Sequence, residues 1–327
     1  MMKAKSCLLF PVFSILLLIA TGQRAHKKSK FKVIGYYSLN AAITADLNTV
    51  PFDKLTHINL FFLNPDTLGN FSSDYTALMS FIKAAHAKKV KVLASIAGGG
   101  IHPYYARLLK DDHRAKLIQD LLLITLKYDL DGIDVDIEGS DIDSNYENFA
   151  IDLARTLKAN KKLITSAITV FYKDALSDKA LAQYDFVNIM SYDHTGPWTP
   201  EKPGPHSTYQ QAVDDLDYFG VERKIPREKM VLGVPFYGYG FGPTLTSPVT
   251  SMNYGQILDS FPGAESTDQV AMPGGAILYY NGIHTIKKKT DLAKEKASGI
   301  MIWQILGDVA GPKSLLDAIH EEAYGEK

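Results

Sequence analysis

Short runs of β-branched and aromatic residues recur along the chain, and segments with a helical pattern of apolar residues separate them. A short apolar run bounded by turn-forming residues is typical of a buried strand. Eight runs fit this description. They are Lys32–Tyr37, His57–Phe62, Val90–Ile96, Gly132–Glu138, Leu163–Ile168, Phe186–Tyr192, Met230–Tyr237 and Gly299–Trp303.

Between the runs, apolar residues recur at intervals of three and four, which is the spacing of a helix packed on one face. The segments Leu78–Ala85 and Leu117–Ile124 show this spacing. Ser144 followed by Glu147 is a capping-box pattern, and it predicts the start of a helix that continues through Leu157. The chain therefore alternates strands with helices.

Eight strands alternating with helices in about 300 residues favour a (β/α)8 TIM barrel, covering 32–327, over an open doubly wound sheet. No Gly-x-Gly-x-x-Gly follows the first run, which weakens a dinucleotide-binding alternative. The 61 residues from Gly238 to Ser298 are more than one loop and helix require. We expect the seventh helix at Thr285–Ala297 and a small inserted lobe at about 238–283, beside the barrel mouth.

The first 22 residues have the pattern of a secretory signal peptide. Lys3 and Lys5 precede an apolar run of 13 residues, Leu8–Ala20, and small residues follow it. Thirteen residues fall short of the ~20 that span a bilayer, which argues against a membrane anchor. We therefore predict a cleavable signal peptide at 1–22, a polar lead-in at 23–31, and export to the extracellular space or the periplasm, with no membrane association afterwards.

Composition adds a few limits. The 327 residues are 46% hydrophobic and 22% charged, which is an ordinary globular balance, and a net charge of −1 gives no indication of a nucleic-acid partner. The only cysteine, Cys7, lies inside the predicted signal peptide. The mature chain would therefore lack disulfides and zinc-thiolate sites. We expect a monomer with no cofactor and no metal.

The stretch "DGIDVDIEG" at 131–139 places four carboxylates within eight positions. Because side chains alternate along a strand, Asp134, Asp136 and Glu138 face one way and the apolar residues between them face the other. The two aspartates would favour a protonated Glu138 at the C-terminal rim, where barrels carry out their chemistry. A metal site or structural acid cluster is the alternative, although no clustered histidines accompany the acids. Asp131 is three positions before Asp134, so its side chain does not share the face of the other acids, and we expect it to be structural.

The segment "LDGIDVDIE" resembles the Asp-x-x-Asp-x-Asp-x-Glu signature of glycoside hydrolase family 18, the chitinases and related endo-β-N-acetylglucosaminidases. "VIGYY", "VNIMSYD" and "GIMIWQ" are similar to the first, sixth and eighth strands of that family. The resemblance extends from about Lys32 to Ala318. Two positions depart from the family pattern. In "SIAGG", Ala97 replaces a glycine, and in "FYGYG", Tyr239 stands where many members have arginine.

The resemblance implies a retaining, substrate-assisted hydrolysis. Glu138 would protonate the glycosidic oxygen, and the substrate's own 2-acetamido oxygen would attack the anomeric carbon to give an oxazolinium ion. Asp136 would orient the acetamido N–H, and Tyr192 would hydrogen-bond the acetamido oxygen. Asp134 and Ser95 would tune Asp136 from below.

The resemblance also implies further sugar contacts. Trp303 would form the floor of the sugar subsite, with simple barrel filling as the alternative. Trp198, in the loop after the sixth run, would stack on leaving-group sugars unless its exposure is incidental. The other candidate contacts lie near strand ends, and core packing is the alternative for the first two. They are Tyr36, Phe62, Ser95, Met190, Asp193 and Tyr237.

The leading hypothesis is a secreted hydrolase of β-1,4-linked N-acetylglucosamine polymers, with carbohydrate as its only expected partner. The runner-up acts on the chitobiose core of N-glycans or on peptidoglycan strands. A non-catalytic lectin is the third hypothesis. The presence of all three acids, Asp134, Asp136 and Glu138, argues against it. The chain has only two tryptophans, too few for an aromatic track along crystalline chitin, so soluble or amorphous substrates fit better.

Overall fold

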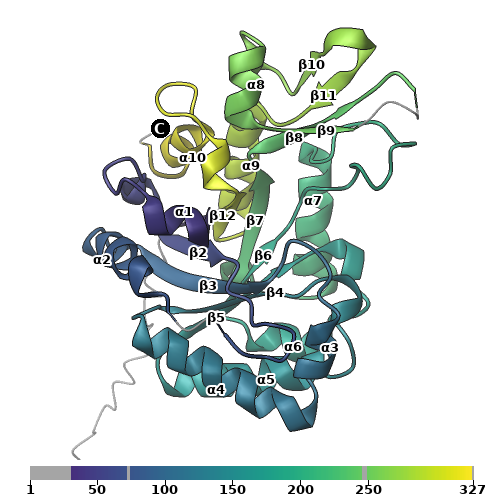
Figure 1. Cartoon of the computed structure of the whole chain (residues 1–327). Coiled ribbons are helices and arrows are strands. Elements are labelled where there is room, and N and C mark those ends of the chain that lie inside the picture. The colour runs from purple at the N-terminus through teal and green to yellow at the C-terminus, as the bar shows by residue number, and fades with distance from the viewer. Residues whose placement is uncertain (1–30, 72–73, 245–248, 326–327) are drawn as a thin grey trace, which may run out of the picture.

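Eight parallel strands close into a barrel in the order β1-β12-β7-β6-β5-β4-β3-β2, and the predicted (β/α)8 fold is confirmed (Figure 1). The computed structural model describes residues 31–71, 74–244 and 249–325. The barrel strands are β1 Lys32–Ser38, β2 His57–Phe61, β3 Lys91–Ala97, β4 Gly132–Asp136, β5 Leu163–Ile168, β6 Phe186–Ile189, β7 Met230–Pro235 and β12 Gly299–Trp303.

Helices cover the outside of the barrel, and their apolar stripes face the strands. In the segment Leu117–Ile124, for example, the side chains of Leu117, Ile118, Leu121 and Leu122 are buried on one helix. The helices that accompany the barrel strands are α1 Leu39–Thr44, α2 Met79–Ala87, α3 Tyr104–Leu108, α4 Asp111–Lys127, α5 Tyr146–Ala159, α6 Asp178–Gln183, α7 Tyr209–Asp217, α9 Ile283–Lys296 and α10 Leu315–Tyr324.

The start of α5 differs from the predicted capping box. The residue before the helix is Asn145, whose side chain makes no capping hydrogen bond. Asp143 instead forms a turn, in which its carboxylate accepts from the Asn145 N–H at 2.8 Å and its carbonyl accepts from the Tyr146 N–H at 3.1 Å. The Ser144 prediction was wrong because this turn moves the N-cap from Ser144 to Asn145 and delays the helix by one residue.

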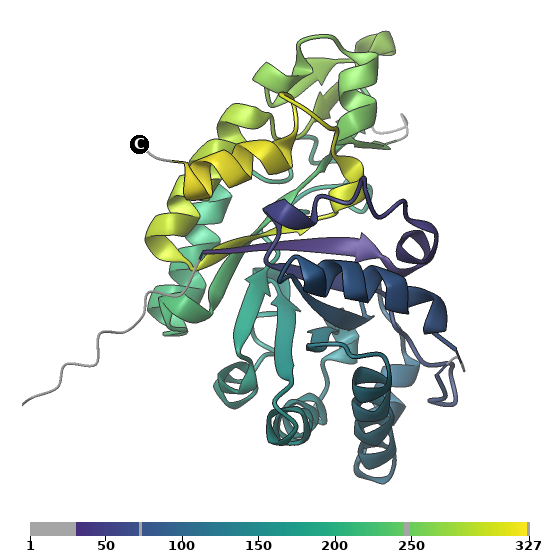
Figure 2. The same ribbon diagram turned by 90° about the vertical axis from the view of Figure 1, so that its left-hand side faces the viewer.

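A small lobe follows β7. It is an antiparallel sheet in the order β10-β11-β8-β9 with one helix beside it. Both views place the lobe next to the C-terminal segment drawn in yellow, on one side of the barrel (Figures 1 and 2). The elements of the lobe are β8 Tyr237–Phe241, β9 Thr250–Asn253, α8 Tyr254–Ser260, β10 Gln269–Ala271 and β11 Ile277–Tyr279.

Four barrel strands end earlier than the sequence predicts. They are β2, β4, β6 and β7, which end at Phe61, Asp136, Ile189 and Pro235. The clearest difference is Tyr237, which was predicted to end the seventh strand but instead begins β8 and pairs with Asn253 of the lobe. The residues just after these strands therefore form the mouth of the barrel.

In the described ranges, no helix is long and apolar enough to cross a bilayer. The predicted signal peptide at 1–22 lies outside the described residues, as does the predicted lead-in apart from Phe31.

Candidate active site

Asp134 lies fully buried inside the barrel and is held by four hydrogen bonds. The donors come from β1, β3, β5 and β6. They are Tyr36 Oη at 2.5 Å, Ser95 Oγ at 2.9 Å, Thr165 Oγ1 at 2.5 Å and Asn188 Nδ2 at 3.2 Å. Burial raises the pKa of Asp134, and the hydrogen bonds from Thr165, Tyr36 and the other donors oppose that rise. Four donors around one carboxyl group suit the ionised form.

Asp136 lies one step nearer the mouth, and it is 3% exposed. Burial raises its pKa well above the ordinary range, and the charges of Glu138 and Asp134 add to the rise. Its Oδ1 atom has no hydrogen-bond partner among the described residues. A buried polar atom of this kind costs free energy unless something else binds it. Asp136 also lines the cleft, so a ligand group can supply the missing donor.

Glu138 follows directly after β4 in extended conformation and lines the same cleft. Burial raises its pKa to about 7, the charge of Asp193 adds to this shift, and His102 and the Gly99 N–H oppose it. Neighbouring buried carboxyl groups resist ionising together, so Asp136 and Glu138 hold one proton between them as neutral pH is approached. Glu138 is therefore suited to donate a proton at the rim.

The floor of the cleft is aromatic. Trp303, at the end of β12, lines the cleft, and its ring lies 5.8 Å from the ring of Phe62 in a stacked arrangement. Tyr36 supports the same ring at 5.3 Å. The Tyr192 hydroxyl reaches Met301 Sδ at 3.9 Å, and burial and the nearby carboxylates raise the pKa of Tyr192 well above its usual value. Its hydroxyl therefore remains a hydrogen-bond donor at the cleft.

Some residues predicted to contact substrate lie beneath the cleft. Tyr36 is 1% exposed and Ser95 is fully buried, and both donate to Asp134. Phe62 is partly exposed and stacks on Trp303. Tyr36 and Ser95 therefore hold Asp134, and Phe62 supports the aromatic floor. The residues that line the cleft do not include these three.

The loop after β3 passes close to the acids in left-handed backbone conformation. Ala97 and Gly98 have φ values of 63° and 62°. A side chain on Gly98 would lie 2.0 Å from the ring of Phe62 and 2.6 Å from Asp136 Oδ2, so only glycine fits there. Ala97 adopts the same conformation with a Cβ atom, which costs about 1–2 kcal/mol.

We therefore expect Ala97→Gly to raise the free energy of unfolding by about 0.5–1 kcal/mol, because relief of the left-handed strain exceeds the added entropy of the unfolded chain. Urea denaturation measures this change. Ala94→Gly, in the extended part of the same strand, is the matched control and should lower stability by about 1 kcal/mol. Equal losses in both variants would contradict the backbone conformation of Ala97.

The cleft has a volume of about 690 Å³ and opens at the carboxyl ends of the strands. Of the predicted contacts, Met190, Asp193, Trp198 and Trp303 line it together with Asp136, Glu138 and Tyr192. Tyr237 does not line it but donates through its hydroxyl to Asp193 Oδ1. The lining residues that sequence reasoning did not assign to the site are Gly99, Gly100, Thr169, Phe171, Tyr172, His194 and Thr199.

Two of these unassigned residues could have been recognised as site residues from their position in the sequence. Phe171 and Tyr172 form an aromatic pair directly after the fifth strand, where a barrel builds its site. The ring of Phe171 lies 5.1 Å from the ring of His194, whose Nε2 is 3.3 Å from Asp215 Oδ2. In the part of the chain that the structure describes, no three metal-ligating side chains converge.

The fold and the cleft together define the class of this protein. A closed (β/α)8 barrel that presents buried acids and an aromatic floor at the carboxyl ends of its strands has the build of a glycoside hydrolase. Within that class, the chain belongs to glycosyl hydrolases family 18, whose family model matches residues 32–308. The resemblance noted from the sequence is confirmed.

Two solved bacterial structures are similar over nearly the whole chain. The GH18 chitinase ChiB from the chitin utilization locus of Flavobacterium johnsoniae is 34% identical with a TM-score of 0.80, covering 90% of this chain and 94% of that one. A chitinase from Bacteroides thetaiotaomicron is 30% identical with a TM-score of 0.78, covering 91% and 98%. Human chitinase-3-like protein 2 is 26% identical over 275 residues, 66% of this chain and 69% of that protein.

Proposed function

We propose that this chain is a chitinase-like hydrolase that cleaves β-1,4 bonds between N-acetylglucosamine units with retention of configuration. The observation that carries the proposal is the pairing of two acids in one cleft. Glu138 has a pKa raised to about 7, and Asp136 has a buried oxygen with no hydrogen-bond partner among the described residues. The first acid suits proton donation, and the second suits an N–H group of the ligand.

In the first step, Glu138 gives its proton to the glycosidic oxygen as the bond to the anomeric carbon breaks. The 2-acetamido oxygen of the same sugar attacks that carbon and forms an oxazolinium ion, so the protein supplies no nucleophile. Asp136 accepts from the acetamido N–H and stabilises the positive charge on the ring. The Tyr192 hydroxyl donates to the acetamido oxygen and aligns it for attack.

In the second step, the ionised Glu138 takes a proton from water, whose oxygen attacks the anomeric carbon from the opposite face. The bond from that carbon to the acetamido oxygen breaks, which opens the oxazolinium ring and restores the acetamido group. Two inversions restore the original β configuration. Asp134 lies deeper in the barrel than Asp136, and its four donors keep its carboxyl group in place throughout. Trp303 forms the platform under the reacting sugar, and Trp198 offers a second ring in the cleft that is 56% exposed.

The names of the relatives include chitinases and one chitinase-like protein. The alternative substrates are the chitobiose core of N-glycans and the glycan strands of peptidoglycan, which contain the same 2-acetamido sugar. A product profile on chitooligosaccharides, a high-mannose glycoprotein and peptidoglycan separates these. We expect turnover chiefly of chitooligosaccharides. Faster release of a high-mannose glycan would favour the endo-β-N-acetylglucosaminidase alternative, and binding without turnover would favour a lectin.

Catalysis should depend on pH through the proton of Glu138. Its pKa of about 7 means that the acid form predominates below pH 7 and is lost as pH rises through 7. We therefore expect kcat/KM to fall by about tenfold per pH unit well above pH 7. Initial rates on a chitin oligosaccharide between pH 5 and 9 measure this fall in kcat/KM, which is the alkaline limb of the pH profile. A rate that rises from pH 7 to 9 would contradict Glu138 as the acid.

We also propose that the protein is exported. The support is the basic start, the apolar run Leu8–Ala20 and the small residues after it. Amino-terminal sequencing of protein recovered outside the cytoplasm tests this, with a start near Gln23 expected. Recovery of the full-length chain from the cytoplasm alone would contradict export.

A further inference from the structure

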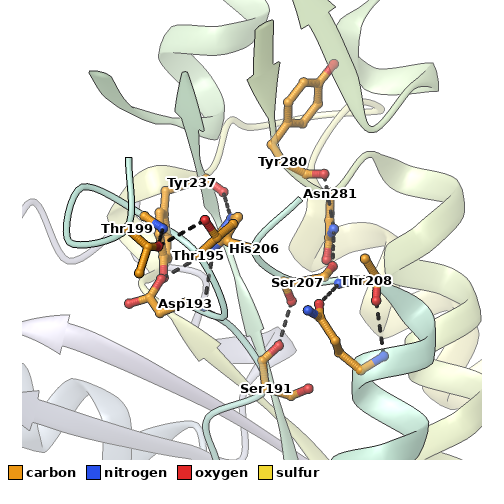
Figure 3. Close-up of polar contacts among 12 residues, drawn as sticks. Ser191, Asp193, Thr195, Thr199, His206, Ser207, Thr208, Tyr237, Tyr280 and Asn281 are labelled. Carbon is orange, nitrogen blue, oxygen red and sulfur yellow. Dashed lines mark hydrogen bonds and ion pairs between the residues drawn. The ribbon is translucent and has the colours of Figure 1, made fainter. Parts of the chain in front are cut away.

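His206 lies beneath the rim of the cleft, in the loop between β6 and α7, and its side chain is 1% exposed. Its Nδ1 atom is 3.3 Å from Asp193 Oδ1 and 3.4 Å from the Asp193 backbone nitrogen. Its Nε2 atom is 3.4 Å from the carbonyl oxygen of Tyr237. Figure 3 shows the ring between these two residues, which come from different parts of the chain. His206 thus links the loop after β6 to the first strand of the lobe.

Asp193 is the residue that this contact holds. Its side chain is 34% exposed and lines the cleft, and its backbone is left-handed with a φ of 63°. Aspartate tolerates this conformation better than most residues, but it still needs support from its surroundings. The support comes from His206 and from the Tyr237 hydroxyl, which donates to Asp193 Oδ1. Tyr237 holds Asp193 Oδ1 from the lobe, and His206 contacts the same oxygen from the loop after β6, while Asp193 lines the cleft.

The contact between His206 and Asp193 takes a different form in each protonation state of the ring. A neutral ring with its proton on Nε2 donates to the Tyr237 carbonyl and accepts from the Asp193 N–H. A protonated ring donates to both the Tyr237 carbonyl and the Asp193 carboxylate. Burial lowers the pKa of His206 and the charge of Lys289 on α9 adds to this, while Asp193 opposes it. The rings of Tyr237 and Tyr239 each lie 4.9 Å away and complete the surroundings.

Asp193 matters to the reaction because of its charge. After burial, it is the largest contributor to the raised pKa of Glu138. An Asp193 carboxylate that moved away from the cleft would leave Glu138 more acidic and would weaken any contact to the bound sugar. A fixed Asp193 is therefore a condition for a Glu138 that keeps its proton near neutral pH.

We propose that His206 is a positioning residue that holds Asp193 in place beside Glu138 and against the bound sugar. This inference rests on the proposed function, because Asp193 and Glu138 act on the substrate there. His206 itself does not line the cleft and has no role in proton transfer, which belongs to Glu138. It acts through Asp193, and its position between the β6 loop and β8 lets the lobe fix the geometry of the barrel mouth.

Three variants test the proposal. His206→Phe keeps a ring between the two tyrosines but removes both nitrogens. His206→Asn places an amide where Nδ1 lies and can keep the contact to Asp193. His57→Phe is the matched control, because His57 is also a buried histidine packed on an aromatic ring, at 5.3 Å from Phe186, and lies at the start of β2 away from the mouth.

We expect His206→Phe to lower kcat/KM on a chitin oligosaccharide by roughly tenfold to a hundredfold, as small misplacements of active-site groups do. Its alkaline limb should move to lower pH by about half a unit or more, because Glu138 loses the effect of the Asp193 charge. His206→Asn should recover most of the lost kcat/KM and most of the shift in the alkaline limb. His57→Phe should match the wild type in both measurements. A His206→Phe enzyme with an unchanged alkaline limb, whether or not it is less stable, would overturn the positioning role.

A second readout needs no turnover. Carbon-13 NMR of labelled glutamate carboxyl groups follows the titration of Glu138 in the ligand-free protein, with Glu138→Gln to assign the signal. A lower Glu138 pKa in His206→Phe than in the wild type and in His57→Phe supports the proposal even if the wild type cleaves no chitin, in which case only the proposed function fails. Identical Glu138 titrations in all three proteins would overturn the positioning role even in an active chitinase.

Discussion

Glu138→Gln is expected to lose about 10²–10⁴-fold of kcat while folding normally and still binding oligosaccharide. The amide has nearly the same shape as the acid, but it cannot deliver a proton to the glycosidic oxygen. The raised pKa of Glu138, about 7, is what makes it a proton donor in the first place. Initial rates on a chitin oligosaccharide give kcat, and calorimetric titration with the same sugar gives binding.

The control for this variant is Glu222→Gln, which makes the same chemical change at an exposed position after α7. It should leave both kcat and binding unchanged. If Glu138→Gln keeps more than about a tenth of the wild-type kcat, another residue is the acid.

Asp136→Asn should lower kcat by about 10²-fold or more for a different reason. The amide removes the negative charge that would stabilise the oxazolinium ion, and its NH₂ group competes with the acetamido N–H for the same place. Stability should not fall, because the buried Asp136 carboxyl has an oxygen without a partner among the described residues and a pKa raised by burial. The measurements are kcat on a chitin oligosaccharide and urea denaturation.

Asp131→Asn is the matched control on the same strand segment. The Asp131 carboxylate accepts from the Val92 N–H at 2.8 Å and contacts His86 Nε2 at 2.9 Å, outside the site. We expect it to lower stability by about 1 kcal/mol with little change in kcat. An undiminished kcat in Asp136→Asn would contradict the role proposed for Asp136.

The barrel was predictable because its strands are buried on both faces and therefore read as continuous apolar runs. The row of acids on β4 was predictable for a related reason. The period of two puts Asp134 and Asp136 on one face, and the structure shows both inside the barrel. Asp131, out of that parity, lies in a network at the start of the strand, with His86 and Val92.

The mouth was less predictable because long-range contacts decide its conformation. Tyr237 continues an apolar run in the sequence, yet its backbone pairs with Asn253 of the lobe. The partners of His206 are separated from it by 13 and 31 residues. No local sequence pattern predicts long-range contacts of this kind. The same holds for Tyr239, whose ring lies 5.8 Å from that of Trp198.

In the proposed mechanism, the substrate's own acetamido group, with Asp136 and Tyr192 holding it, replaces an enzymic nucleophile. An intramolecular attack gains the high effective concentration of a tethered group, which makes such a replacement feasible.

The most direct test compares matched oligosaccharides that carry a 2-acetamido, a free 2-amino or a 2-hydroxyl group on the sugar being cleaved, with NMR spectra recorded before mutarotation. We expect appreciable turnover of the 2-acetamido compound alone, with the β anomer as the first product. Efficient cleavage of the 2-hydroxyl compound, or an initial α product, would contradict it.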